Sequence, residues 1–240
     1  MARLTIIAEK RQLVIPGDLI AEGNYLTGES TFKEGDKIYA TRIGLVDTDG
    51  RSVSVVALKG GYIPSVGDLV IGKVIDVSLS GWVVDINAPY AAILHASDAI
   101  ERPFNPQRDV LTSIYDIGDM ILAKVAAYDR TRNPVLTTHG PGLGKITRGR
   151  IVEIVAAKIP RLIGKRGSMI NMLKHETGCH LTIGQNGLIL ISGRSPEDED
   201  LAVLAIRKIE EEAHTSGLTD RICSMIREEN QKRGVSNVSS

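Results

Sequence analysis

Apolar and polar residues alternate along about the first 140 residues, which is the spacing of β-strands. Two such runs, residues 37–46 and 51–58, flank the dipeptide Asp49-Gly50, a strong signal for a hairpin turn. The segment ahead of them, residues 14–36, is extended and rich in turn residues, and residues 1 to about 60 as a whole are short of core residues. This pattern predicts a β-rich N-terminal domain at residues 1–60.

Strand-like runs continue at residues 67–86, 90–97 and 118–138, with turn residues between them. Short strands at even spacing are typical of a small β-barrel. We therefore expect a five-stranded barrel of the OB-fold type within residues 61–145. The last seven residues of this range resemble a nucleotide-binding loop, but they lack its first glycine and its Ser or Thr, so we expect a flexible linker there.

After residue 145 the pattern becomes one of mixed strands and helices. Strands are expected at residues 149–157, 179–184 and 188–193. A short helix is expected at residues 168–178, where a glycine ends it.

A longer helix is expected at residues 195–217 and a last one at 220–230. Ser195 is a suitable N-cap for the longer helix. The residues expected to form its buried stripe are Leu201, Leu204, Ala205 and Ile209. These elements predict an α+β domain at residues 146–235, which includes an extra C-terminal helix. A disordered tail is expected at residues 236–240.

The formal net charge of zero conceals two blocks of opposite sign. Residues 145–167 hold seven Lys or Arg residues against one Glu, a net charge of +6, whereas residues 196–213 hold two basic residues against seven acidic ones, a net charge of −5. The basic block fits an anionic polymer, and the acidic block fits the solvated face of the longer helix. Aromatic residues make up only 4% of the chain, which disfavours a surface built on base stacking.

The sequence contains no signal-peptide pattern and no apolar run of about 18 residues, so we expect no membrane span. Cys179 and Cys223 define neither a disulfide framework nor a zinc pair, which fits a cytoplasmic protein. His175, Cys179 and His180 straddle a helix end and a strand start without a fourth ligand, so we expect no metal site. No nucleophile motif or catalytic carboxylate pair is recognisable, so we expect no cofactor and no catalytic activity.

The most specific chemical signal is Gly164-Lys165-Arg166-Gly167. The two glycines permit a tight turn and leave the backbone bare just ahead of a helix. Free N–H groups at a helix N-terminus favour an anion, and the two cations add full positive charges. We therefore predict that this loop grips the phosphates of RNA.

Two further cations of the basic block, Lys158 and Arg161, are expected to contact RNA beside this loop. Residues 184–187 repeat the Gly-x-x-Gly pattern, but Asn186-Gly187 lies between two strands. That copy indicates a hairpin turn.

Because the loop at residues 164–167 has a strand before it and a helix after it, residues 146 to about 213 resemble a KH domain of type I. Residues from about 65 to 138 resemble the S1 type of OB-fold RNA-binding domain, through GKVIDVSLSGWVVDI and ILHAS. His95 matches the RNA-facing histidine of S1 domains. The family's two aromatic positions are Ser80 and Val83 here, so we expect contact with the RNA backbone through basic side chains. The arginines of the barrel loops are either further RNA contacts or ordinary solvated residues: Arg102, Arg108, Arg130 and Arg132.

The whole chain resembles the S1–KH cap subunits of the archaeal RNA exosome, with VIPGDLIAEG ahead of the S1 domain and IPRLIGKRGSMI and GQNG in the KH domain. The resemblance implies a non-catalytic RNA-binding component of a 3′–5′ RNA degradation complex. It implies a trimeric cap, of one protein or mixed with another S1-type subunit, docked through residues 1–60 onto a hexameric ring of RNase PH-type subunits. Such a cap recruits RNA, with a preference for adenine-rich tails, and threads it into the pore.

The main alternative is an S1–KH transcription or translation factor that binds RNA without a nuclease partner. A bacterial-type antitermination factor would carry two KH units, and only one is recognisable here. Polynucleotide phosphorylase places its KH before its S1 domain, behind a large catalytic body that this chain lacks. A scaffold that binds only protein does not account for the basic block.

Overall fold

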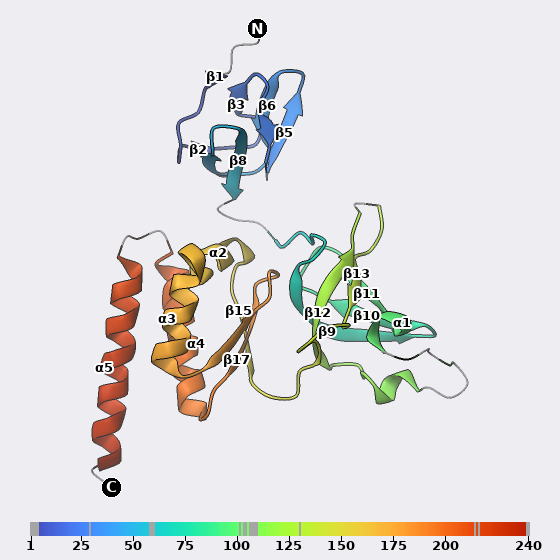
Figure 1. Ribbon diagram of the computed structural model, residues 1–240, viewed down its shortest axis with the longest axis vertical. Coiled ribbons are helices and arrows are strands. Elements are labelled where there is room, and N and C mark those ends of the chain that lie inside the picture. Colours follow the sequence, from blue (N-terminus) through green and yellow to red (C-terminus); the bar gives the residue numbers. More distant parts are fainter. Residues whose placement is uncertain are drawn as a thin grey trace. The chain divides into compact units, whose positions relative to one another are not determined.

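The computed structural model of the chain describes residues 5–28, 30–57, 61–100, 102, 105, 110–129, 131–213, 215 and 217–238. The chain divides into two compact units, Met1–Gly60 and Gly61–Ser240. Within the second unit, a β-barrel comes first and a domain of helices and strands follows (Figure 1).

The N-terminal unit consists of two four-stranded sheets around one core. One sheet has the order β1 (Thr5–Ile6), β3 (Leu19–Glu22), β6 (Lys37–Ala40), β5 (Thr31–Glu34). The other has the order β2 (Leu13–Val14), β7 (Gly44–Thr48), β8 (Ser52–Ala57), β4 (Leu26–Thr27). Ten buried side chains, Ile20 and Ile38 among them, form the core. The expected shortage of core residues is therefore wrong, because short strands from the whole segment each contribute one or two apolar side chains.

The hairpin expected at Asp49-Gly50 is confirmed. β7 and β8 pair antiparallel on either side of it, and Gly50 has a φ of +86°. The Asp49 carboxylate accepts hydrogen bonds from the backbone N–H groups of Arg51 (2.9 Å) and Ser52 (2.6 Å). The run at residues 37–46 is not one strand, because the chain bends after β6 and crosses to the other sheet as β7.

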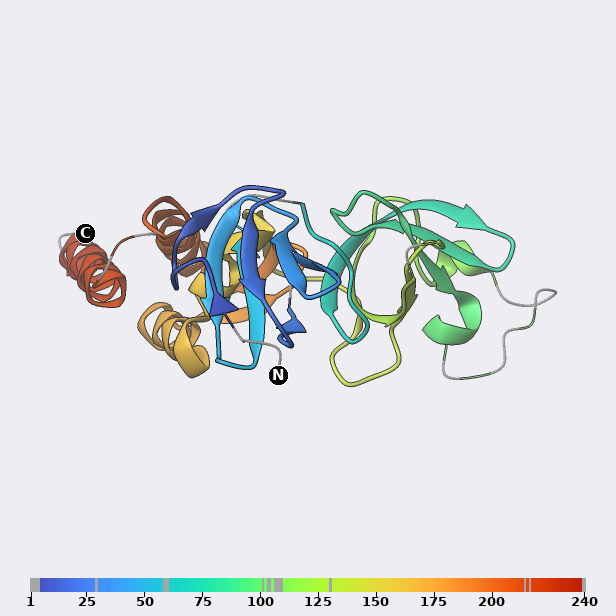
Figure 2. The same cartoon turned by 90° about the horizontal axis from the view of Figure 1, so that it is seen from above.

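The barrel expected in the second unit is also confirmed. Its strands are β9 (Leu69–Ser78), β10 (Gly81–Asp85), β11 (Ala92–His95), β12 (Met120–Ala127) and β13 (Val135–Thr137). Each strand pairs with two others, and the contacts of β13 with β11 and β12 close the ring. Figure 2 shows these strands curling around a common axis. A short helix, α1 (Ala96–Ala99), and a 3-10 turn, η1 (Leu111–Ser113), lie between β11 and β12.

The flexible linker expected after the barrel is partly ordered. Its last two residues form β14 (Gly144–Lys145), which pairs with β12. The ammonium group of Lys145 also pairs with the carboxylate of Asp119. The composition of the segment, rich in glycine, conceals this pairing.

The C-terminal part has the β-α-α-β-β-α order of a type I KH domain. Its elements are β15 (Arg150–Glu153), α2 (Ile159–Ile163), α3 (Ser168–Thr177), β16 (His180–Ile183), β17 (Leu188–Ser192) and α4 (Pro196–Glu211). The strands form an antiparallel sheet in the order β15-β17-β16. The strand expected at residues 149–157 ends early, and a 3-10 turn, η2 (Ala156–Lys158), leads into α2. The hydrophobic pattern does not predict α2, which is only five residues long.

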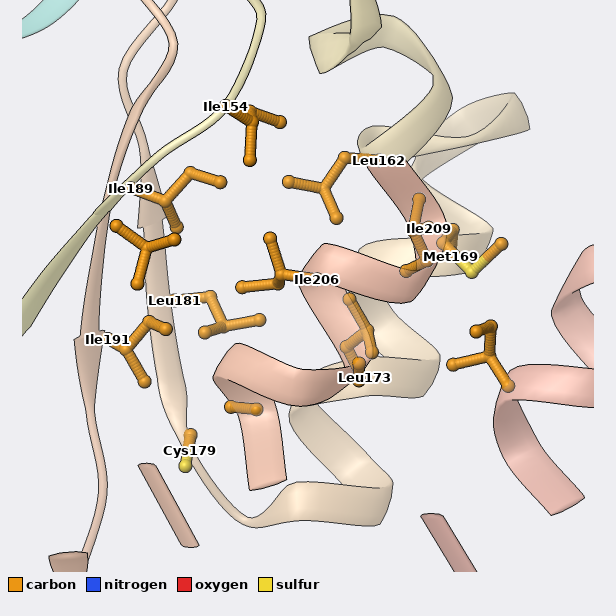
Figure 3. Close-up of a cluster of buried hydrophobic side chains, with 14 of the residues drawn as sticks. Ile154, Leu162, Met169, Leu173, Cys179, Leu181, Ile189, Ile191, Ile206 and Ile209 are labelled. Atoms are coloured by element: carbon orange, nitrogen blue, oxygen red, sulfur yellow. The ribbon is translucent and has the colours of Figure 1, made fainter. Parts of the chain in front are cut away.

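One hydrophobic core lies between the helices and the sheet. Figure 3 shows the apolar side chains of the helices facing those of the strands: Leu162, Met169, Leu173, Ile206 and Ile209 against Leu181, Ile189 and Ile191. The expected N-cap of α4 is confirmed, because the Ser195 hydroxyl accepts a hydrogen bond from the N–H of Asp198 (3.2 Å). Leu204 is 49% exposed and does not belong to the buried stripe, in which Ala202 and Ile206 lie instead.

A last helix, α5 (Leu218–Val238), packs against α3 and α4 through buried residues such as Ile222 and Ile226. The Arg227 guanidinium of α5 donates two hydrogen bonds, of 2.9 and 2.7 Å, to the Glu176 carboxylate at the end of α3. This pairing lowers the pKa of Glu176 to about 2. Residues 236–238, expected in a disordered tail, are helical, and the last two residues lie outside the described part. None of the described helices has the length and apolar character needed to cross a membrane.

Candidate nucleic-acid interface

A sharp loop connects α2 to α3 at the predicted Gly-x-x-Gly site. Gly164 ends α2 with a φ of +73°, and a Cβ there would lie only 2.8 Å from the Cβ and N atoms of Met169. Arg166 and Gly167 both have left-handed backbones, with φ of +52° and +80°. The chain therefore makes a tight turn between the two helices, and position 164 has no room for a side chain.

The charges of this loop are open to solvent. Lys165 and Arg166 are exposed, and neither side chain has a hydrogen bond or ion pair with any residue that the structure describes. Gly167 is the N-cap of α3, so the N–H groups of the first turn have no cap from an N-cap side chain. The positive end of α3 and two free cations therefore lie side by side, an arrangement that suits a phosphate group.

Lys158 and Arg161, predicted as neighbouring RNA contacts, have partners inside the domain. The ammonium group of Lys158 donates to the carbonyl of Glu210 (2.8 Å), at the C-terminal end of α4. The guanidinium of Arg161 donates to the carbonyl of Thr215 (2.9 Å), and its buried Nε has no hydrogen-bond partner among the residues that the structure describes. The two side chains bond the η2–α2 segment to the C-terminal end of α4 and to Thr215, which follows α4. They thereby hold α2 in position behind the loop.

Other cations of the +6 block are also paired. Lys145 pairs with Asp119, and Arg150 with Asp200. Together with Lys158 and Arg161, four of the seven cations have partners within the chain. Only Lys145 and Arg150 are paired with carboxylates, and the carbonyl partners of Lys158 and Arg161 carry no net charge. The block therefore keeps a net positive charge, part of which Lys165 and Arg166 expose at the loop.

On the barrel, His95 is exposed at the end of β11, opposite Gly81 of β10. A Cβ on Gly81 would lie 2.1 Å from the carbonyl oxygen of Leu94, so a glycine is required for this pairing. The next outward-facing pair is Val83 with Ile93, and both side chains are half-buried. The neighbouring outward-facing side chains, Val83 and Ile93, are therefore aliphatic rather than aromatic.

The single tryptophan of the chain, Trp82, points the other way. It is fully buried in the barrel core, and its indole N–H donates to the carbonyl of Tyr115 (2.8 Å). The two rings meet edge to face, with centroids 5.1 Å apart. Trp82 cannot stack on a base, which supports the expectation that the barrel contacts the RNA backbone.

Two of the four candidate barrel arginines can be placed. Arg102 and Arg132 are exposed, the latter between β12 and β13. Arg108 and Arg130 lie outside the described residues. In the described parts of the chain, no three His, Cys, Asp or Glu side chains come together as a group that could hold a metal ion.

The turn between β16 and β17 has a role that sequence reasoning missed. Asn186 is fully buried, and its side-chain NH2 donates to the carbonyls of Ile71 (2.6 Å) and Ile86 (2.8 Å) in the barrel. Its side-chain oxygen accepts from the N–H of Ile71 (3.3 Å). The neighbouring N–H of Gln185 donates to the carbonyl of Leu69 (2.8 Å). The hairpin turn predicted here exists, but its tip is a joint between the two domains.

Comparison with known proteins matches three separate parts of the chain to family models and most of its length to relatives. Residues 11–59 match the exosome RNA binding protein RRP4 N-terminal domain, residues 61–127 the RRP4 S1 domain, and residues 150–211 the KH domain. The exosome complex component Rrp4 of Pyrococcus furiosus is 48% identical over 235 residues, which are 96% of this chain and 89% of the relative. That of Thermofilum pendens is 46% identical over 228 residues, which are 94% of this chain and 96% of the relative. A crystal structure of an exosome complex RNA-binding protein, 48% identical, covers 72% of this chain and 99% of its own, with a TM-score of 0.69.

Proposed function

Since this chain belongs to the Rrp4 family of exosome components, we propose that it is the non-catalytic RNA-binding subunit of an exosome that degrades RNA from the 3′ end. Three copies, or a mixture with another S1-type subunit, cap a hexameric ring of RNase PH-type subunits. The cap captures RNA and threads it into the pore of the ring. The observation that carries RNA binding is the free pair of cations, Lys165 and Arg166, at the N-terminus of α3.

Contact with RNA is made chiefly to its backbone. The loop offers charge and N–H groups, and the outward pair Val83–Ile93 offers no aromatic platform beside His95. We expect adenine-rich RNA to compete for the site better than poly(U) or poly(C). Equal competition by all three RNAs would contradict the adenine preference but would still be consistent with binding to the RNA backbone.

The N-terminal unit docks on the ring through the outer face of the β2-β7-β8-β4 sheet. Leu13, Leu45 and Val56 are direct cross-strand partners, so their side chains form one row on a single face. Leu26, paired with β8 from the other edge, lies on the same face. Leu13, Val56 and Leu26 are 55%, 51% and 68% exposed. A contiguous apolar row on so small a unit is typical of a protein contact.

Size-exclusion chromatography with the purified ring of the same organism tests this assignment. The full chain is expected to co-elute with the ring, whereas a Leu13→Ser, Val56→Ser double variant is expected to elute separately and to keep its RNA affinity. Phe32→Ser is a suitable control, because Phe32 is equally exposed, at 57%, on the other sheet.

If the double variant co-elutes like the wild type, this face is not the docking surface. If the wild-type chain does not associate with the ring but still binds RNA, the better description is an S1–KH factor without a nuclease partner.

A further inference from the structure

We infer that Asn171, with Ser168 beside it, recognises the ribose 2′-hydroxyl of a nucleotide held at the 164–167 loop, and so makes this loop select RNA over DNA. The inference rests on the RNA-binding function proposed above and deepens it. Lys165 and Arg166 provide affinity for any phosphate backbone, whereas the two uncharged side chains determine which sugar is preferred.

Each glycine of the loop has an uncharged polar side chain of α3 close to it. A Cβ on Gly164 would lie 3.0 Å from the hydroxyl oxygen of Ser168, and a Cβ on Gly167 would lie 3.5 Å from the amide nitrogen of Asn171. The two polar groups therefore lie at the two points of the loop that carry no side chain of their own. A bound strand can approach the backbone most closely at these points.

Both side chains are available to a ligand. Ser168 and Asn171 are exposed, and neither side chain has a hydrogen bond with any residue that the structure describes. The helix packs into the core of the KH domain through other residues, Met169 and Leu173 among them. The hydrogen-bonding groups of Ser168 and Asn171 are therefore free for a bound strand.

The chemistry of these groups fits a sugar hydroxyl better than a phosphate. A phosphate oxygen only accepts hydrogen bonds, and Lys165, Arg166 and the N–H groups at the start of α3 already offer it donors. A 2′-hydroxyl both donates and accepts, as do the amide of Asn171 and the hydroxyl of Ser168. In an RNA strand this hydroxyl is on the carbon next to the one that bears the 3′ phosphate, so it lies beside a phosphate bound at the loop.

An adenine base is another ligand that an amide can recognise with a donor and an acceptor. The amide of Asn171 lies close to the backbone of the loop at Gly167, however, where the sugars and phosphates of a strand approach. The edge of a base lies further from the phosphates than the sugar does. The position of the amide therefore favours the sugar, and strands of two base compositions distinguish the two ligands.

The test compares RNA and DNA strands of about four nucleotides, the length that a KH domain clamps. Binding of oligoadenylate and of oligodeoxyadenylate to the full chain is followed by NMR. From the net strength of one hydrogen bond, the wild type is expected to bind the RNA strand about threefold to tenfold more tightly than the DNA strand. Asn171→Ala is expected to lose this advantage by binding RNA less tightly, while its affinity for DNA stays within about twofold of the wild type.

Two further variants and a second RNA serve as controls. Asn24→Ala removes the same side chain from an exposed turn of the N-terminal unit and is expected to change neither affinity. Ser168→Ala is expected to give a smaller loss of the same kind as Asn171→Ala, confined to RNA. Oligouridylate is expected to show the same loss as oligoadenylate, because the two strands share the sugar.

A second measurement keeps the test decisive if a variant does not fold. RNA strands in which one ribose at a time is replaced by deoxyribose are compared on the wild-type chain. One position is expected to account for most of the RNA advantage, and the same replacement should cost nothing further in Asn171→Ala. The inference would be overturned by equal affinity of the wild type for RNA and DNA, or by an advantage spread evenly over all positions. It would also be overturned if Asn171→Ala weakened RNA and DNA equally, or weakened only adenine strands.

Failure of this inference can be told from failure of the proposed function. If Lys165→Ala, Arg166→Ala binds the short RNA and DNA strands as tightly as the wild type, the loop is not the RNA site and the proposed function is wrong at that point. If that variant weakens binding of both strands while Asn171→Ala keeps the RNA advantage, the loop binds nucleic acid but Asn171 does not recognise the sugar.

Discussion

Removing the two loop cations gives the most direct test of the RNA site. For single-stranded nucleic acid, each phosphate contact contributes about 0.7 to the slope of log affinity against log salt. If Lys165 and Arg166 each make one contact, the Lys165→Ala, Arg166→Ala variant loses about 1.4 from this slope. Over a fourfold rise in salt, from about 50 to about 200 mM, the wild type should then lose about sevenfold more affinity than the variant.

The perturbation is clean because neither side chain supports the fold. Both are exposed and, among the residues that the structure describes, neither has a bonding partner. The free energy of unfolding should therefore change by less than about 0.5 kcal/mol. A change in RNA affinity can then be assigned to lost contacts and not to lost structure.

The assay is fluorescence anisotropy of labelled oligoadenylate at several salt concentrations. The matched control is Lys174→Ala, Arg194→Ala, which removes the same charge from the other end of α3. Gly193, the residue before Arg194, lies against the sulfur of Cys179, which follows the C-terminal end of α3. Arg194 is therefore close to that end of the helix. Equal salt slopes for wild type and loop variant, or an equal effect of the control, would refute a local phosphate site.

Three further expectations follow from the structure. Gly164→Ala should destabilise the protein by about 1–3 kcal/mol in chemical denaturation, because the new Cβ meets Met169 and φ is left-handed; a neutral effect would contradict the loop geometry. Glu176 has a pKa of about 2 against an ordinary 4.5, so its bond to Arg227 adds stability above pH 4.5 that is lost as the pH falls toward 2; Glu176→Gln should remove that part of the pH dependence, and an unchanged profile would argue against the contact. Purified chain with poly(A), magnesium and phosphate should release no nucleoside diphosphates, and release that tracks with this chain through purification would overturn its non-catalytic assignment.

Local signals in the sequence predicted the parts of the fold that local chemistry determines. Asp49-Gly50 identified a hairpin and Ser195 a helix cap, since each acts within three or four residues. Gly164 was recognised for the same reason, because a left-handed turn before a helix needs glycine whatever the rest of the domain does.

Contacts between distant residues could not be predicted in this way. The carbonyls that bind Lys158 and Arg161 lie 52 and 54 residues further along the chain, so these cations looked free. Asn186 is separated from its barrel partner Ile71 by 115 residues, and an Asn-Gly turn reads the same whether its side chain faces water or another domain. Because its partners are backbone carbonyls, which every residue has, the sequence does not reveal the contact of Asn186 with the barrel. Only the three-dimensional structure shows it.

The position of the single tryptophan allows unfolding of the barrel to be followed by fluorescence, separately from the rest of the chain. Trp82 is sealed in the barrel core, whereas most of the helical residues belong to the KH part. Indole emission therefore reports on the barrel, and far-ultraviolet circular dichroism near 222 nm reports chiefly on the KH helices. Because the amide of Asn186 bonds one domain to the other, denaturation curves from the two signals should coincide in the native chain and separate when that amide is lost. Comparison of the two signals therefore measures, without any added label, how cooperatively the barrel and the KH domain unfold.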